Sequence, residues 1–133
     1  MKPFAALKMT GVAAVMGLFL LASPQSASAE FLTDGRLTTD SRIGAYGANC
    51  YYQVYNVNLK AGRIYVIDLK SRDFDAYLYL LDPSGNILAW DDDSGGNLDA
   101  RIVFNAQDSG AYRIVVTTYA PFTTGAFRLR VTP

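Results

Sequence analysis

The sequence predicts an all-β protein, an antiparallel β-sandwich with jelly-roll-like or Greek-key connections and seven or eight strands. Short runs of alternating apolar and polar residues recur about every ten residues, with turn residues between them. No run in the second part of the chain has convincing helical periodicity. Most of the aromatic residues are tyrosines, 9 in all, which suit inward positions whose hydroxyls reach a sheet edge. Strands of this kind close best as two packed sheets.

The first 29 residues are expected to be a signal peptide. Lys2 and Lys8 give a positive start, Met9–Ala22 is apolar, and Ala27–Ala29 has the small-x-small pattern of a cleavage site. The apolar run of about 14 residues is shorter than the roughly 20 that a membrane-spanning helix needs. A retained membrane anchor is the alternative. We therefore expect an exported protein, secreted or periplasmic.

Residues 30–133 have the length of one domain. They carry ten basic and twelve acidic side chains, a balance that argues against a nucleic-acid partner. No basic amphipathic segment indicates a membrane surface. The chain has no histidine, which excludes Ser-His-Asp and Cys-His catalysis and histidine-ligated zinc. Cys50 is the single cysteine and is interpreted as a buried thiol, with an intermolecular disulfide as the alternative.

The first half of the domain contains three expected strands. In Phe31–Leu37 the pair Asp34-Gly35 indicates a turn, and the loop that follows has room for a short strand near Ile43. Tyr51–Leu59 alternates strictly, as a half-buried strand does. Arg63–Leu69 alternates again after a glycine-containing turn. These last two runs are predicted to form a hairpin.

The second half contains a predicted core hairpin and three further strands. Ala76–Leu81 is almost continuously apolar, which favours a position in the middle of a sheet with both faces covered. Pro83–Asn86 has the proline and glycine of a tight turn, and Ile87–Trp90 is the returning strand. The last strands are expected at Ala100–Ala106, Ala111–Tyr119 and Ala126–Val131.

Several of these segments resemble a known family, the bacterial pre-peptidase C-terminal domain. The segments are Phe74–Leu80, Asp82–Asn86, Asp91–Gly96, Ala100–Ile102 and Gly110–Val116, and the resemblance extends over about residues 54–131. It implies a β-sandwich module of secreted bacterial proteins that usually follows a peptidase domain and is often removed during maturation. The family is similar to collagenase collagen-binding modules, which bind calcium and use surface aromatic residues for their ligand.

The loop after Trp90 is the candidate metal site. Three aspartates in a row repel one another unless something compensates their charge, and calcium prefers six to eight oxygen ligands. The spacing does not fit an EF-hand, because Gly95 and Ile102 stand where ligands are expected. The alternative is a solvated turn whose aspartates cap their own backbone or pair with Arg72 or Arg101. The candidate calcium ligands are Asp73, Asp75, Asp91, Asp92, Asp93, Asn97 and Asp99.

Aromatic residues at strand ends and in loops are the other functional signal, because a binding face collects such side chains. The alternative is that they are core residues whose polar ends reach water. Trp90, directly before the aspartates, is the foremost candidate. The candidate binding residues are Trp90, Tyr51, Tyr52 and Tyr119, with Tyr46 and Phe122 in similar positions.

Three functions follow as hypotheses. The first is a non-enzymatic module that binds an extracellular protein or polysaccharide surface, with or without calcium as its only cofactor. The second is an accessory or chaperone-like domain that acts on a peptidase in trans. The third is a small hydrolase that uses a carboxylate pair such as Asp75 with Asp92. A catalytic acid normally needs an apolar pocket, and this loop is polar and rich in glycine. We therefore expect no enzyme.

Overall fold

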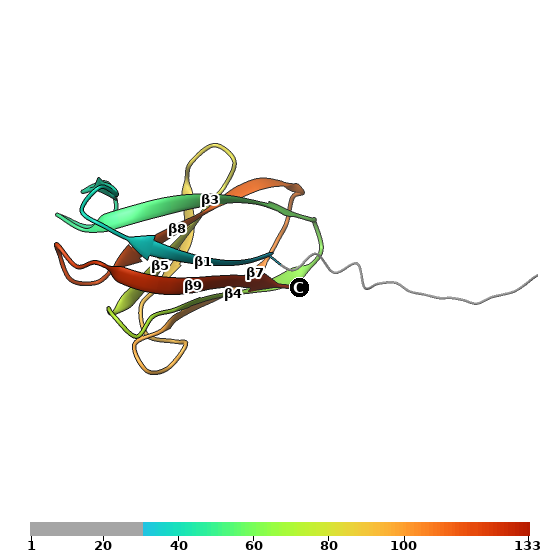
Figure 1. The fold of residues 1–133 in the computed structure, drawn as a ribbon. Helices are drawn as coiled ribbons and strands as arrows, with labels where there is room; N and C mark the ends of the chain where they lie inside the picture. The colour runs from blue at the N-terminus through green and yellow to red at the C-terminus, as the bar shows by residue number, and fades with distance from the viewer. Residues whose placement is uncertain (1–30) are drawn as a thin grey trace, which may run out of the picture.

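The computed structural model describes residues 31–133, which fold into two antiparallel sheets packed face to face (Figure 1). The expected signal peptide and Glu30 lie outside the described residues. No helix of the described part is long and apolar enough to cross a membrane. The strands are β1 (Phe31–Leu37), β2 (Arg42–Ile43), β3 (Tyr51–Leu59), β4 (Ile64–Lys70), β5 (Ala76–Leu81), β6 (Ile87–Asp91), β7 (Ala100–Asn105), β8 (Gly110–Thr118) and β9 (Gly125–Thr132).

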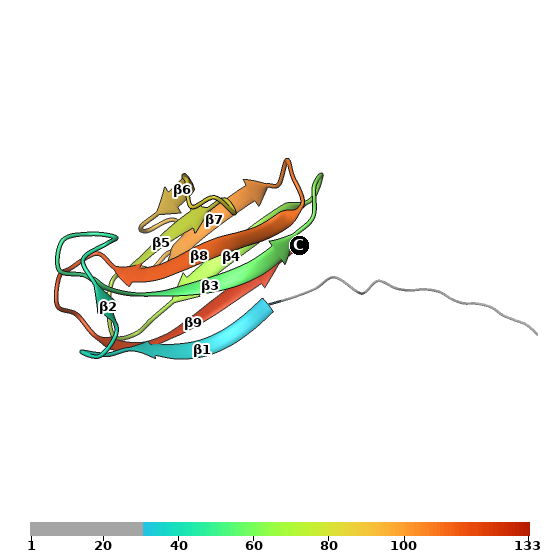
Figure 2. The ribbon, with the colours of Figure 1, turned by 90° about the horizontal axis from the view of Figure 1, so that it is seen from above.

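The all-β sandwich predicted from the sequence is confirmed. One sheet has four strands in the order β1-β9-β4-β7, and the other has five in the order β2-β3-β8-β5-β6. Seen from above, the two layers run roughly along the same direction (Figure 2). The described strands number nine rather than seven or eight, because Arg42–Ile43 forms a two-residue strand on β3. Most successive strands change sheet, as jelly-roll and Greek-key connections do.

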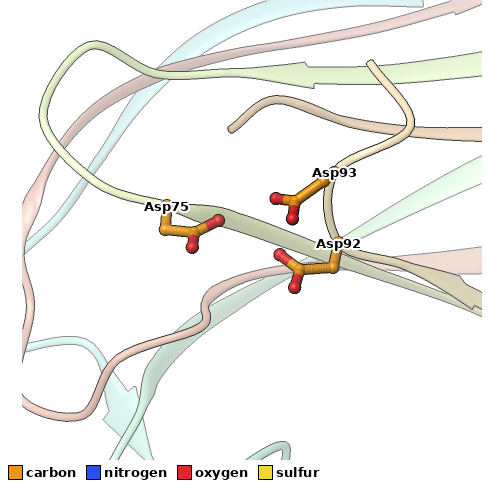
Figure 3. A group of neighbouring side chains, drawn as sticks. All are labelled: Asp75, Asp92 and Asp93. Atoms are coloured by element: carbon orange, nitrogen blue, oxygen red, sulfur yellow. The ribbon is translucent and has the colours of Figure 1, made fainter. Parts of the chain in front are cut away.

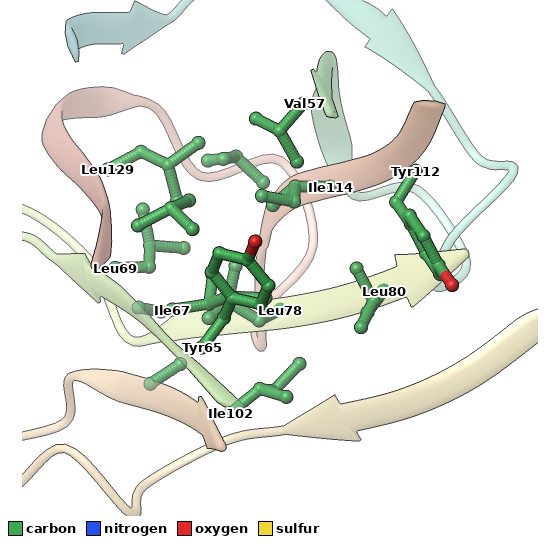
Figure 4. Close-up of a cluster of buried hydrophobic side chains, with 14 of the residues drawn as sticks. Val57, Tyr65, Ile67, Leu69, Leu78, Leu80, Ile102, Tyr112, Ile114 and Leu129 are labelled. Atoms are coloured by element: carbon green, nitrogen blue, oxygen red, sulfur yellow. The ribbon is translucent and has the colours of Figure 1, made fainter. Parts of the chain in front are cut away.

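The core lies between the sheets and is built from the predicted inward positions. Alternate residues of each strand point to it, because side chains of a strand switch faces at every residue. Figure 4 shows these side chains meeting from both layers. Burying one large aliphatic side chain stabilises a fold by about 1.5–3 kcal/mol. The largest contributors with no more than 5% exposure include Leu59, Tyr65, Ile67, Leu69, Leu78, Leu80, Ile102, Tyr112, Ile114, Val116, Phe127, Leu129 and Val131.

The predicted hairpin between Tyr51–Leu59 and Arg63–Leu69 is wrong. Strand β3 pairs with β8 in the five-stranded sheet, whereas β4 pairs with β7 and β9 in the other sheet. The turn between them is tied to the far end of β7 instead: Gly62 N–H donates to the carbonyl of Ala106 at 2.8 Å, and Ala106 N–H donates to Arg63 at 2.9 Å. The short turn therefore leads from one sheet to the other at the edge of the core, and the apolar faces of β3 and β4 lie opposite each other.

The predicted turn at Asp34-Gly35 is also wrong, because β1 runs without a break from Phe31 to Leu37 along β9. Gly35 instead leaves room for the side chains of Phe127 and Tyr55 to pack against the β1 backbone. A Cβ atom at Gly35 would lie 2.4 Å from the ring of Phe127 and 2.9 Å from the hydroxyl of Tyr55. Asp34 meanwhile accepts hydrogen bonds from Arg128 of the neighbouring strand.

The predicted core hairpin at residues 76–90 is present as β5 and β6. Asp82 organises its turn by accepting hydrogen bonds from the backbone N–H groups of Ser84 and Asn86 at 2.9 and 2.8 Å. Gly85 adopts a φ of 93°, which favours glycine. The hairpin places the end of β6 beside the start of β5, and this brings the acidic loop next to Asp75.

Candidate functional site

The acidic loop follows β6 and leads into β7. In the hairpin register, Leu78 lies opposite Asp91, so the residues just before β5 lie beside those just after β6. Asp75 thereby meets Asp92 and Asp93, and Figure 3 shows the three carboxyl groups pointing toward one another. Each offers an oxygen atom within 4.8 Å of the others. Asp75 and Asp92 are half-buried, and Asp93 is exposed.

The proximity of these groups perturbs their protonation. Burial raises the pKa of Asp92 to about 6, helped by the hydrogen bond to Asp75 and by the charges of Asp75 and Asp93. Burial is also the main cause that raises the pKa of Asp75. When neither carboxyl group carries a proton, Oδ1 of Asp75 and Oδ1 of Asp92 are buried without a hydrogen-bond partner. An unpaired buried oxygen is energetically unfavourable, so this cluster lacks a compensating group.

The other predicted ligands have different partners in the described structure. Asp91 Oδ2 accepts hydrogen bonds from the backbone N–H groups of Ser94 and Arg101, both at 2.9 Å, and Oδ1 accepts one from the Ser94 hydroxyl at 2.6 Å. Burial would raise the pKa of Asp91, but these hydrogen bonds outweigh it and the pKa is lowered. Asp91 thus holds both arms of the loop.

Asp73, Asp99 and Asn97 also lie away from the three-carboxylate cluster. Asp73 Oδ2 accepts the backbone N–H of Ala126 at 2.7 Å, and Asp99 Oδ1 accepts that of Ser71 at 3.1 Å. Asn97 is exposed at a φ of 54°. Of the seven predicted ligands, the structure brings together only Asp75, Asp92 and Asp93.

The cluster fits a calcium ion by its donor set and spacing. Calcium binds oxygen at about 2.3–2.6 Å, so oxygens within 4.8 Å of one another can reach a single ion. The two orphaned oxygens would gain a partner. Water or backbone carbonyls would have to complete the six to eight ligands that calcium takes.

The predicted aromatic residues mostly gather on the outer face of the five-stranded sheet. Trp90 is 64% exposed and Tyr119 is 62% exposed. In the register, Trp90 stands beside Tyr79, and Tyr52 stands across Thr117 from Tyr77. Tyr51 is different, because its side chain packs against the core cluster.

Ring contacts join five tyrosines of this face, and Trp90 lies beside Tyr79 in the register. We call the surface that they form the aromatic face. Tyr46 packs on Tyr52 with ring centroids 5.0 Å apart and on Tyr79 at 5.4 Å. Tyr77 packs on Tyr79 at 5.1 Å and stacks on Tyr119 at 6.5 Å with 17° between the planes. The aromatic face consists of Tyr46, Tyr52, Tyr77, Tyr79, Trp90 and Tyr119.

Tyr77 and Tyr79 were not among the predicted binding residues. Their run was interpreted as buried on both sides because it is almost continuously apolar. The signal that could identify them is the alternation of tyrosine with leucine from Tyr77 to Leu80. Leucines on that strand fill the core, whereas the tyrosines, half-buried, form the opposite face.

A comparison with known protein families identifies the family of this chain. Residues 51–118 match the bacterial pre-peptidase C-terminal domain. The chain belongs to this family. Pre-peptidase C-terminal domains are non-catalytic accessory domains. In this member, the match begins at β3 and ends at β8, so it includes the acidic loop and most of the aromatic face, while β1 and β9 lie outside it.

Two solved structures share the fold of this pre-peptidase C-terminal domain. The pre-peptidase C-terminal domain of collagenase from Bacillus anthracis is 21% identical with a TM-score of 0.57, over 77% of this chain and 88% of that one. Aeromonas hydrophila PliG, a periplasmic lysozyme inhibitor of g-type lysozyme, is 11% identical with a TM-score of 0.57, over 84% and 91%. No curated protein sequence matches the chain.

Proposed function

We propose that this protein is an exported, non-enzymatic module that binds an extracellular polysaccharide or protein surface through its aromatic face. The observation that carries the proposal is a set of five tyrosine rings in contact on the outside of one sheet, with Trp90 beside Tyr79 in the register. Trp90 and Tyr119 are more than half exposed. Monomeric soluble proteins seldom expose such a contiguous set without a ligand or partner. Family membership and the two structural neighbours support a non-catalytic β module in an extracellular or periplasmic location.

The shape and chemistry of the face suit an extended ligand. Tyrosine and tryptophan offer large, rigid contact areas with a polar group at one end. Tyr46 lies across Tyr52 and Tyr79 and fixes their rings. Rings that are already held in place lose little conformational entropy when they bind. A sugar chain or an extended peptide lying on the sheet would contact several rings at once.

The test is co-sedimentation of the purified protein with insoluble chitin, cellulose, peptidoglycan and collagen. We expect binding to at least one of them, and the variant Trp90→Ala/Tyr119→Ala should bind at least about tenfold more weakly, as loss of aromatic anchors at an interface predicts. Val103→Ala is a matched control, since Val103 is also 64% exposed but lies on β7 of the opposite sheet. Equal loss in the control and the double variant would contradict the assignment of this face.

We further propose that calcium stabilises the acidic loop by binding Asp75, Asp92 and Asp93. The two orphaned carboxylate oxygens and the crowding of three acidic groups support this. By holding the end of β6, the ion would also fix the backbone beside Trp90. The loop would then act as a support for the aromatic face and not as a reaction centre.

Thermal unfolding after removal of divalent cations tests the calcium proposal. At a free calcium concentration ten times Kd, the Tm is expected to rise by roughly 5–10 °C. The variant Asp92→Asn/Asp93→Asn should lose this response, and Asp40→Asn, an exposed aspartate in another loop, should keep it. An unchanged Tm of the metal-free protein in millimolar calcium would overturn the proposal.

A second candidate is binding to an enzyme in the same compartment, such as a peptidase in trans. Its support is that the same architecture occurs in a protein described as an inhibitor of g-type lysozyme. An activity assay of a g-type lysozyme and of a secreted peptidase, with and without excess purified protein, would test it. Unchanged activity of both enzymes, together with binding to a polysaccharide, would favour the first candidate.

A further inference from the structure

The outer face of the four-stranded sheet has a chemistry unlike that of the aromatic face. In the register, Asp34 of β1 lies across from Arg128 of β9, which lies across from Lys70 of β4. In the next row outward-facing residues follow in the order Leu32, Arg130, Asp68 and Arg101. Arg36 follows Asp34 on β1 and lies on the same side of the strand. We call the cationic residues Arg36, Lys70, Arg101, Arg128 and Arg130 the basic face.

The charge of this face is opposite to that of the rest of the domain. Its five cations face two acidic side chains, Asp34 and Asp68. Residues 30–133 contain ten basic and twelve acidic side chains in all, so the remainder has five basic and ten acidic. A face of one sign on a protein of the other sign is a local field that attracts an oppositely charged ligand.

Two of the cations have a fixed orientation. Arg128 donates to both oxygens of Asp34, from Nε at 2.7 Å and from a terminal nitrogen at 3.0 Å. Arg101 Nε donates to Asp68 at 2.6 Å, and Asp68 also lies across from Arg130. Arg128, Asp34 and Arg101 are exposed, whereas the Asp68 side chain is only 14% exposed. Ion pairs at the surface contribute little to stability. Their consequence is that the guanidinium groups lie along the sheet, with further N–H donors left for a ligand.

Beyond the sheet, unpaired cations lie at a depression. A shallow hollow of about 560 Å³ at the ends of β1, β4 and β9 is lined by Lys70, Arg72 and Arg128 among others. In the described part of the chain, Lys70, Arg72 and Arg36 have no carboxylate within 4.0 Å. The hollow also contains three carboxylates: Asp34 pairs with Arg128, and Asp73 and Asp99 accept backbone hydrogen bonds. Its three cations and three carboxylates balance, so the excess of positive charge lies on the basic face itself.

We propose that the basic face binds an acidic polysaccharide, one that carries carboxylate or sulfate groups along its length. Arginine forks match these groups with paired hydrogen bonds. Side chains two residues apart on a strand lie about 7 Å apart, and neighbouring strands are about 4.8 Å apart, so the cations form a regular array that a linear polymer can follow. This ligand is separate from the one proposed for the aromatic face.

The rest of the face argues against nucleic acid as the polyanion. Its other outward side chains are aliphatic or small: Leu32, Ile64, Val66, Val103, Asn105 and Thr132. Single-stranded nucleic acid is normally bound by aromatic side chains that stack on bases, and in this protein the exposed rings gather on the opposite sheet. A flat sheet face also presents no element that enters a duplex groove.

The test compares binding of the purified protein to dextran sulfate and polygalacturonate with binding to uncharged dextran. We expect retention on both acidic polymers at low ionic strength, elution as salt rises, and no retention on dextran. The variant Arg36→Gln/Lys70→Gln should bind about tenfold more weakly, because it removes two exposed cations of the basic face that have no ion pair of their own among the described residues. Arg113→Gln is the matched control. Arg113 is an exposed arginine on β8 of the other sheet, and its variant should bind like the unchanged protein.

Four outcomes would overturn the proposal. They are no retention on either acidic polymer, equal weakening by the control variant, tighter binding to a single-stranded oligonucleotide, and tighter binding to phosphatidylglycerol vesicles. The variants concern exposed side chains, so an unchanged Tm is expected and should be measured alongside. The Trp90→Ala/Tyr119→Ala variant should keep its affinity for dextran sulfate, which separates this face from the aromatic one.

Discussion

The carboxylates in and beside the acidic loop fall into two groups, those that accept backbone hydrogen bonds and those that keep an oxygen without a partner. Asp91 accepts three hydrogen bonds and holds the backbone, whereas Asp75 and Asp92 each keep a buried oxygen without a partner. Adjacent residues of one type thus differ because a strand turns successive side chains to opposite sides. The first kind stabilises the loop on its own, and the second requires a proton or a cation. These two groups lead to two predictions.

Replacing Asp91 by alanine should destabilise the whole domain. The backbone N–H groups of Ser94 and Arg101 would lose their acceptor, and hydrogen bonds to a charged group contribute about 1.5–3 kcal/mol. We expect a decrease of about 2 kcal/mol in the free energy of unfolding, measured by urea denaturation. Asp40→Ala is the control, because Asp40 is an exposed aspartate in another loop, and it should change stability by no more than about 0.5 kcal/mol. Equal effects of the two substitutions would contradict the assigned role of Asp91.

In the absence of divalent cations, stability should fall as pH rises from about 4 to 6. The pKa of Asp92 is about 6 in the fold and 3.8 ordinarily, so the folded protein binds more protons than the unfolded chain in this range. Urea denaturation at several pH values should show the decline, and Asp92→Asn should flatten it. The folded protein lowers the pKa of Asp34, Asp82 and Asp91. Their ionised forms stabilise the fold, and this contribution is lost as pH falls below about 4. These three groups therefore make stability rise with pH, but in a lower pH range than Asp92. Identical pH profiles for both proteins would exclude Asp92 as the titrating group.

Among the elements, β1 shows what a glycine does inside a strand. Gly35 lies under the ring of Phe127 on the paired strand β9. Gly35→Ala should therefore lower the free energy of unfolding by about 1–3 kcal/mol through overpacking. Thr39→Ala is the control, because Thr39 lies in an exposed turn. Gly44→Ala is unsuitable, because Gly44 has a φ of 90°. Stability equal to that of the unchanged protein, measured by urea denaturation, would show that Phe127 moves aside without loss.

The strands themselves could be predicted from sequence, but their partners could not. Alternation in Tyr51–Leu59 and Arg63–Leu69 identified the inward side chains correctly. Pairing depends on residues far away: β3 pairs with β8 and β1 with β9, and no local pattern encodes such distant contacts. The short turn between β3 and β4 therefore suggested a hairpin that the fold does not contain.

The candidate site was predictable to a similar degree. The hairpin of β5 and β6 could be recognised from its turn residues, and it places Asp75 beside Asp92 and Asp93. Whether a given aspartate binds backbone N–H groups, as Asp91 does, depends on how the loop returns to β7. Tyr77 and Tyr79 were assigned to the core because composition alone does not show which side of a sheet is covered.

At the scale of the whole molecule, the sandwich separates two surfaces of different chemistry. The aromatic face lies on the outside of the five-stranded sheet, and the basic face lies on the outside of the four-stranded sheet. Both depend on the same core, since each strand contributes one residue outward for each residue inward. A ligand on one face leaves the other accessible. The two proposals together predict a protein that links two different polymers.

The same interdependence predicts that residues 51–118, the part that matches the family, do not fold alone. Strand β9 lies between β1 and β4, and the fragment lacks Leu37, Phe127, Leu129 and Val131, each no more than 4% exposed. At about 1.5–3 kcal/mol for each buried side chain, the loss is about 6–12 kcal/mol, comparable with the entire stability of a domain, about 5–15 kcal/mol.

Thermal unfolding followed by near-ultraviolet circular dichroism tests this prediction. The full chain should unfold in one cooperative transition, and the fragment 51–118 should show none. Leu129→Ala in the full chain is a milder version of the same change, because it removes one side chain from the centre of the core at a loss of about 2–5 kcal/mol. A cooperative transition in the fragment would mean that β3 to β8 form a complete core, and that β1 and β9 are additions to it.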